Sequence, residues 1–119
     1  MNNNLKIIAE AGINHNGDIN KAFSLIDKAK EAGASFVKFQ TFIPKNLVTK
    51  YAETVTYQKK TSKESYQLNL LSKNCLNFSQ FKQLYSYSKK IGINLLSSPF
   101  DEQSLNFLLK LKLDYIKIP

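Results

Sequence analysis

The sequence predicts an α/β protein: the N-terminal half of a (β/α)8 TIM barrel, with the order (βα)3β and a long insertion after the second strand. Three observations predict this fold. Short apolar runs alternate with stretches of helical periodicity, and each apolar run ends in polar residues. The chain has 119 residues, whereas a whole barrel takes roughly 250. We therefore expect residues 1–119 to form one partial barrel domain.

The first strand, helix and second strand are expected close together in the sequence. Residues 5–9 form a short apolar run, and residues 35–40 form the next one. Between them Asp18 or Asn20 can cap a helix, and Gly33 is placed to end it. The apolar positions of this helix follow helical spacing: Ala22, Phe23, Ile26, Ala29 and Ala32. Such a βαβ unit is right-handed and implies parallel strands.

A long insertion separates the second strand from the next main helix. Residues 41–77 exceed the usual length of a βα loop. Residues 49–63 are polar with Tyr51 and Tyr57 interspersed, and residues 65–71 are expected to be helical. Insertions at the carboxyl ends of barrel strands commonly shape substrate pockets.

The remaining chain repeats the helix and strand pattern. A helix is expected from Asn77 or Ser79 to Gly92, followed by the third strand at residues 93–97. Its apolar face would carry Phe81, Leu84, Tyr85, Ser88 and Ile91. Asp101 caps the last helix, and the fourth strand is expected at Tyr115–Ile118. That helix would turn Leu105, Leu108 and Leu109 inward. The first and fourth strands would be open edges.

Composition excludes several classes of function. The chain is 43% hydrophobic, which argues against wholesale disorder. No apolar run approaches the ~20 residues of a membrane span. Cys75 is the single cysteine, so no internal disulfide is possible, which fits a reducing cytoplasm, and packing is its expected role. The net charge of +8 comes from 17 basic residues that are all lysine, scattered along the helices. A solvated surface is favoured over nucleic-acid binding, because arginine is absent.

Polar side chains at the strand ends are the candidate functional residues. Lys38 and Lys117 would each place an ammonium at a strand end, which is costly unless it meets an anion. Ser98 precedes Pro99, so its backbone is biased toward extended geometry and its hydroxyl can face a pocket. Glu10 and Gln40 end two other apolar runs. Taken one by one, these residues also fit structural roles. The lysines could extend to solvent from the strand ends, and Ser98 could be a turn residue. Glu10 could be a carboxylate paired with a lysine, and Gln40 a plain amide at a strand end.

Four motifs in register resemble the N-terminal part of the sialic acid synthases. They are IAEAGINHNGD at 8–18, VKFQTF at 37–42, LSSPFD at 96–101 and KIP at 117–119. This N-acetylneuraminate synthase family includes legionaminic and pseudaminic acid synthases, and the resemblance covers residues 5–119. It implies a (β/α)8 barrel followed by an antifreeze-like domain in a homodimer. The second half of that barrel and the antifreeze-like domain are absent from these residues.

The resemblance also implies a reaction. The family condenses phosphoenolpyruvate with an N-acylmannosamine-type sugar, with C–O cleavage and release of phosphate. By resemblance, Lys38, Ser98 and Lys117 bind phosphoenolpyruvate. Glu10 would lie near the sugar carbonyl for proton transfer, and Gln40 would hydrogen-bond the sugar.

The resemblance further implies a divalent metal, manganese or magnesium, with ligands expected beyond residue 119. His15 is the single histidine, in a loop rich in glycine and asparagine. A structural role is favoured for it over metal binding. No metal ligand is therefore assigned within the sequence.

Other readings of the sequence remain open. The chain could derive from another phosphoenolpyruvate-dependent or aldolase-type barrel enzyme, or be a truncated, non-catalytic partner of a full-length synthase. Residues 1–119 alone are expected to be inactive. Residues 41–77, including Tyr57 and Gln58, look closer to the neuraminate and legionaminate branches than to the pseudaminate branch. The acceptor sugar itself is not defined.

Overall fold

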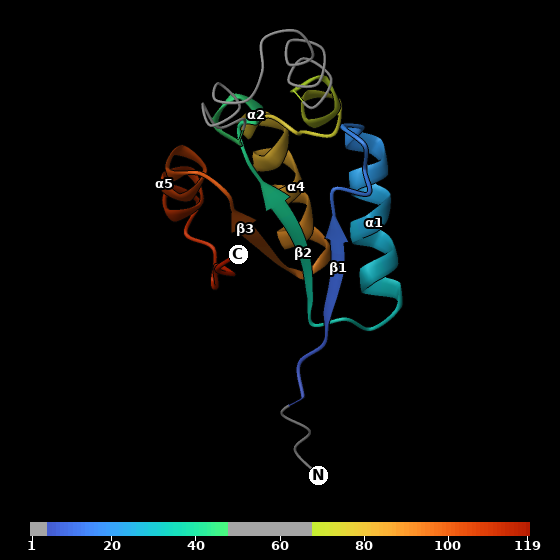
Figure 1. The fold of residues 1–119 in the computed structure, drawn as a ribbon. Coiled ribbons are helices and arrows are strands. Elements are labelled where there is room, and N and C mark those ends of the chain that lie inside the picture. The colour runs from blue at the N-terminus through green and yellow to red at the C-terminus, as the bar shows by residue number, and fades with distance from the viewer. Residues whose placement is uncertain (1–4, 48–67) are drawn as a thin grey trace, which may run out of the picture.

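A computed structural model describes residues 5–47 and 68–119 of the chain. The elements follow the predicted alternation of strands and helices (Figure 1). In chain order they are β1 (Ile8–Gly12), α1 (Ile19–Glu31), β2 (Phe36–Thr41), α2 (Pro44–Leu47), α4 (Phe78–Ile91), β3 (Asn94–Pro99) and α5 (Glu102–Leu111). Residues 68–73 are also helical. The predictions for Tyr51, Tyr57, Gln58 and residues 65–67 fall outside the described residues.

The three strands form one parallel sheet in the order β1-β2-β3, as the half-barrel prediction requires. Two strands are displaced from their predicted positions. The β1 ladder opens at Ile8 opposite Phe36, because the carbonyl of Ile7 already accepts from both Ser35 N and Phe36 N. The β3 ladder extends to Pro99. Glu10 and Ser98 therefore lie inside strands rather than at or beyond their ends.

The fourth predicted strand does not form. Residues 113–119 have no regular structure, and Tyr115 packs edge-on against Phe36 with 5.6 Å between ring centroids. One backbone hydrogen bond joins Lys117 N to Ser97 O, at 3.2 Å. In a parallel ladder this bond would place Lys117 opposite Ser98. A single bond is too little to make a strand, so the prediction for Tyr115–Ile118 is wrong for this structure.

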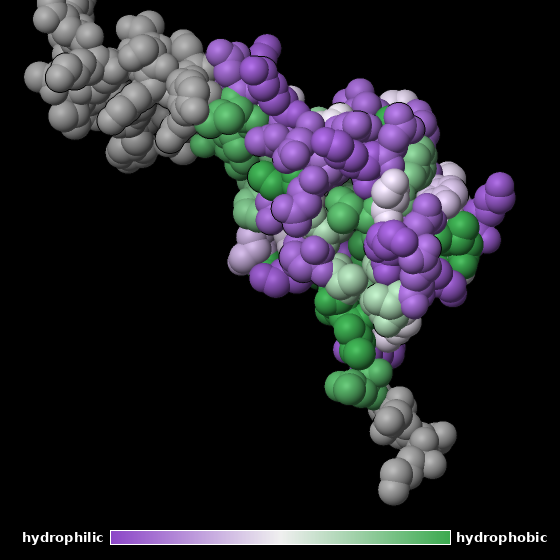
Figure 2. Space-filling view, turned by 90° about the vertical axis from the view of Figure 1, so that its right-hand side faces the viewer, coloured by the Kyte–Doolittle hydropathy of each residue, from purple (hydrophilic) through white to green (hydrophobic). Residues whose placement is uncertain are grey.

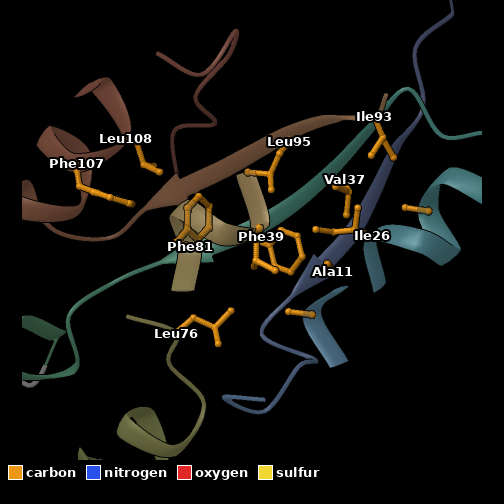
Figure 3. Close-up of a cluster of buried hydrophobic side chains, with 13 residues drawn as sticks. Ala11, Ile26, Val37, Phe39, Leu76, Phe81, Ile93, Leu95, Phe107 and Leu108 are labelled. Atoms are coloured by element: carbon orange, nitrogen blue, oxygen red, sulfur yellow. The ribbon is translucent and has the colours of Figure 1, made fainter. Parts of the chain in front are cut away.

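The core lies between one face of the sheet and the helices (Figure 3). Val37, Phe39 and Leu95 project from the sheet toward Ile26 of α1 and Phe81 of α4. The predicted apolar faces are confirmed for Ala22, Ile26 and Ala29 of α1 and for Phe81, Leu84 and Ser88 of α4. Ala32, also predicted, follows the end of α1 and is exposed. This packing leaves the opposite face of the sheet without helices among the described residues.

Helix α5 buries Leu108 as predicted and leaves Leu105 half-buried, but it does not bury Leu109. Its buried residues are Ser104, Phe107 and Leu108, whereas Leu109 is 56% exposed. Ser104 is drawn inward because its hydroxyl donates to Asp101. Phe107 and Leu108 follow Ser104 at spacings of three and four residues and share its face of the helix. Leu109 therefore points to solvent.

The predicted caps at the helix starts are confirmed. Asp18, Asn77 and Asp101 accept backbone hydrogen bonds at the starts of α1, α4 and α5. Helix α4 has Gly92 as its C-cap, as predicted, whereas the C-cap of α1 is Ala32, one residue before the predicted Gly33. Across the two long helices, Tyr87 donates to Asp27 at 2.6 Å. These contacts fix both helices on the same face of the sheet.

The outer surface over α1 is largely hydrophilic (Figure 2). Hydrophobic residues gather at the lower end of that view, where the chain runs toward its N-terminus. Leu5, Ile7 and Ile8 are the exposed large apolar residues of this segment. No helix within the described ranges is long and apolar enough to cross a membrane.

Candidate functional site

The predicted site residues lie on the sheet face that faces away from the core. Along β2, Val37 and Phe39 pack into the core. Because side chains alternate along a strand, Lys38 and Gln40 point to the opposite face. The register places Glu10 opposite Lys38, and Ser98 opposite Gln40. Four of the five predicted residues thus share one surface that spans three strands.

Glu10 and Lys38 form an ion pair on this surface. Lys38 Nζ lies 2.5 Å from Glu10 Oε2. The lysine side chain is only 15% exposed, whereas the glutamate side chain is 51% exposed. The ammonium is thus held against the sheet, and its carboxylate partner stands on the solvent side. An incoming anion would meet a positive charge held at the sheet, whose present partner is half exposed to solvent.

Gly12 borders both Glu10 and Gln40, although it was not among the predicted site residues. Its φ is +55°, and a Cβ built on it would lie 3.3 Å from Glu10 Oε1 and 3.9 Å from Gln40 Nε2. The ladder with β2 shifts register between Glu10 and Gly12. The left-handed backbone favours glycine, and the bare Cα leaves room for the two side chains. In the sequence, the position of Gly12 two residues after Glu10 was the feature that could have indicated its place in the site.

Ser98 is buried and Lys117 is exposed. Ser98 lies within β3, which rules out the alternative of a turn serine. Lys117 is joined to this strand by the single backbone bond to Ser97. The structure therefore brings Glu10, Lys38, Gln40 and Ser98 together, and it leaves the Lys117 side chain at the edge of the group.

An aromatic contact closes the amino end of the same face. Phe36 begins β2 two residues before Lys38, and Tyr115 covers its ring. Lys6 Nζ lies 5.6 Å from the centroid of each of these rings. The polar groups consequently open toward the carboxyl ends of the strands, where barrel enzymes carry their active sites.

His15 is buried in the loop after β1. Its Nδ1 accepts from Gly17 N at 3.0 Å, and its ring lies 6.1 Å from that of Phe39. Burial lowers the pKa of this imidazole. The described residues hold no group of three or more histidine, cysteine, aspartate or glutamate side chains that could bind a metal ion. These contacts fit the structural role expected for His15.

Cys75 packs against the segment that follows β2. Its thiol donates to the carbonyl of Phe42 at 3.2 Å. Burial, together with the charge of Asp101, raises the pKa of this thiol. It therefore stays protonated as a donor, in line with its expected packing role. An apolar pocket of about 260 Å³ lies between residues 42–44 and 75–78, apart from the predicted site residues.

Comparison with protein families gives a match over most of the chain. The NeuB family model matches residues 25–119. The chain belongs to the NeuB family. Two relatives of the chain are N,N'-diacetyllegionaminic acid synthases. The one from Campylobacter jejuni is 46% identical over 95% of this chain and 34% of its own length. The one from Legionella pneumophila is 45% identical over 95% of this chain and 32% of its own.

The fold of the chain also matches solved structures. The N-acetylneuraminic acid synthetase of Leptospira borgpetersenii, crystallised with citrate, superposes with a TM-score of 0.78 at 32% identity. The match covers 98% of this chain and 36% of that one. A pseudaminic acid synthase from Helicobacter pylori is 32% identical over 95% of this chain, below the legionaminic acid synthases. This NeuB chain spans about a third of the length of the curated relatives it matches.

Proposed function

We propose that this chain is the N-terminal part of a nonulosonate synthase that condenses phosphoenolpyruvate with an N-acylmannosamine-type sugar. The observation that carries the proposal is the surface formed by Glu10, Lys38, Gln40 and Ser98, at the carboxyl side of a parallel half-barrel. Membership of the NeuB family supports it. The names of the two legionaminic acid synthases favour a diacetylated sugar as the acceptor.

Lys38 is the proposed anchor for the anionic substrate. Phosphoenolpyruvate carries a phosphate and a carboxylate, and a lysine ammonium binds such groups as a point charge. Because the Lys38 side chain is 15% exposed, its charge stays at the sheet surface when an anion replaces Glu10 as its partner. Ser98 would add a hydroxyl donor, and Lys117 a second ammonium at the edge of the site.

Glu10 and Gln40 would serve the sugar. Glu10, released from Lys38, would lie beside the acceptor carbonyl, where a carboxylate can take or give a proton. Gln40, on the other side of Gly12, would donate to a sugar oxygen. In the reaction C3 of phosphoenolpyruvate bonds to the aldehyde carbon, and water bonds to C2. The C–O bond to phosphate then breaks and leaves a 2-keto acid. These residues contribute mainly by positioning and charge.

A divalent metal belongs to this chemistry by family resemblance, but the described residues do not fit a metal centre. Glu10 is paired with Lys38, and His15 Nδ1 accepts from Gly17. We therefore assign no metal ligand in the described ranges and keep the expectation that the ligands follow residue 119. By the same reasoning residues 1–119 alone would be inactive.

Release of phosphate tests the proposal directly. The complete protein encoded by the gene is mixed with phosphoenolpyruvate, manganese and a panel of N-acylmannosamine-type sugars, mono- and diacetylated. We expect phosphate release and a 2-keto acid product with at least one sugar. A folded protein that releases no phosphate with any of them would refute the synthase and favour a non-catalytic partner.

A lysine pair gives the residue-level test. Lys38→Met removes the proposed anchor and is expected to lower kcat/KM for phosphoenolpyruvate about a hundredfold or more. Lys82→Met removes an exposed lysine of α4 on the far side of the core and should change it little. Equal effects of the two substitutions would remove Lys38 from the proposed site.

A further inference from the structure

The carboxyl ends of β2 and β3 are joined by contacts beyond the sheet ladder. Thr41 Oγ1 and Ser97 Oγ lie 2.6 Å apart in a buried hydrogen bond. Phe100 N donates to Thr41 O at 3.1 Å. Ile43 N donates to Asp101 Oδ2 at 2.8 Å. We call these five residues the β2–β3 clamp.

Asp101 performs two tasks with one carboxylate. Its Oδ1 accepts from Ser104 N at 2.9 Å, which caps α5. Its Oδ2 accepts from Ser104 Oγ at 2.8 Å and from Ile43 N, in the segment after β2. Partial burial acts to raise the pKa of this carboxyl, but hydrogen bonds from Ser104, Ile43 and Asn46 outweigh it and lower the pKa. The carboxylate is therefore charged and fully engaged at neutral pH.

The local sequence explains why a side chain is needed here. The β2–β3 ladder pairs Thr41 with Pro99, and beyond that pair Phe100 N donates to Thr41 O. Ile43 precedes Pro44, which biases its backbone away from helical geometry. Its amide would lack a partner in the sheet, and Asp101 supplies one. The bond between Ile43 and Asp101 thus joins the two segments just beyond the paired strands.

We propose that Asp101 is a positioning residue, which holds β2 and β3 so that Gln40 and Ser98 keep their places in the substrate site. Gln40 directly precedes Thr41, and Ser98 directly follows Ser97, so both neighbour the clamp. They also pair across the sheet. The inference rests on the synthase function proposed above. Asp101 itself need not touch substrate.

Asparagine at position 101 separates positioning from helix capping. Asparagine caps helices about as well as aspartate. In Asp101→Asn the remaining oxygen can still accept from Ser104 N, but the new amide group cannot accept from Ile43 N. We expect KM for phosphoenolpyruvate to rise about tenfold in the complete protein, since small misplacements of binding groups are costly. We also expect the Ile43 amide to lose protection from hydrogen exchange.

Asp18→Asn is the matched control. Asp18 caps α1 through Oδ1, and among the described residues its side chain has no hydrogen bond to another strand or loop. Asp18→Asn should leave kcat and the KM for phosphoenolpyruvate close to those of the wild type. A reduced folded fraction would lower kcat and leave KM unchanged. A KM for Asp101→Asn equal to that of Asp18→Asn would overturn the inference.

A second replacement guards against misfolding. In Asp101→Ser the hydroxyl can still cap α5 but is too short to reach Ile43 as well. It should raise KM as asparagine does. If neither variant folds, Asp101 serves the stability of the fold and the inference fails. An inactive wild-type protein would instead refute the synthase function, so the two failures are distinguishable.

Discussion

Gly17 and Gly33 have nearly the same backbone angle but different surroundings. Their φ values are +75° and +76°. A Cβ on Gly17 would lie 2.1 Å from the carbonyl oxygen of Lys73, whereas a Cβ on Gly33 would meet nothing within 4 Å. The loop after β1 therefore touches the backbone that precedes α4, and only a residue without a side chain permits this contact.

This difference gives a paired prediction. Gly33→Ala carries only the cost of a left-handed backbone, about 1 kcal/mol of unfolding free energy. Gly17→Ala adds a clash with main-chain atoms that cannot rotate away, so we expect a loss of about 2–4 kcal/mol. Urea unfolding of both variants measures the difference. Equal losses of unfolding free energy would mean that the backbone of Lys73 leaves room for a Cβ at position 17.

Single residues differ in how far the sequence could predict them. Lys38 and Gln40 follow from strand alternation once β2 is placed, because a strand with one buried face turns alternate residues to the other. The bond between Asp101 and Ile43 spans 58 positions in the sequence. No local pattern encodes such a contact, so Asp101 was predicted only as a helix cap. Gly12 follows Glu10 by two residues in the sequence, but its closeness to Gln40 depends on how β1 pairs with β2.

The helices owe their starts to a few side chains. At the start of α4, Asn77 Oδ1 accepts from Gln80 N at 2.8 Å, and Gln80 Oε1 accepts from Asn77 N at 2.9 Å. This capping box satisfies two backbone donors that have no partner within the helix. Helix α4 carries Phe81 and Leu84 into the core, so its start also sets how these residues pack.

Removal of this cap should be measurable. Asn77→Ala deletes the acceptor for Gln80 N and is expected to lower the unfolding free energy by about 1 kcal/mol. Asn77→Asp keeps an oxygen in the same place and should stay near the wild-type value. Thermal or urea unfolding compares the three proteins. If the alanine variant is as stable as the aspartate variant, the capping box adds nothing to stability.

Whole elements were easier to predict than their limits. Helix starts are predictable at Asp18, Asn77 and Asp101, because such side chains accept hydrogen bonds from the first backbone amides of a helix. Strand limits depend on the neighbouring strand, and so Ile8 rather than Leu5 opens the ladder. The expected fourth strand shows the same dependence, since an apolar run makes a strand only where a ladder of bonds forms. Leu109 was predicted to be buried, but the hydrogen bond from Ser104 to Asp101 places Ser104 inside and leaves Leu109 exposed.

The molecule as a whole should weaken in acid in two steps. Burial lowers the folded-state pKa of His15 below its usual 6.5, so the unfolded chain binds a proton more readily. His15 thus contributes stability that is complete above pH 6.5 and lost as the pH falls toward its lowered pKa. Hydrogen bonds likewise lower the pKa of Asp101 below its usual 3.8. Its contribution is present above that value and lost on further acidification.

His15→Gln isolates the first step. Glutamine cannot gain this proton, so the variant should lose less unfolding free energy than the wild type between pH 6.5 and pH 5. Unfolding by urea at several pH values measures both slopes. If the two proteins lose stability in parallel over that range, the His15 proton is not linked to folding.

The segments on both sides of residues 48–67 contact other parts of the fold. On one side Asp101 holds Ile43. On the other side Cys75 binds the carbonyl of Phe42, and Lys73 rests against Gly17. Substitutions, insertions or recombination between these anchors need not disturb the inherited strands. The positions of β1, β2 and β3 therefore do not depend on which residues join the two anchors.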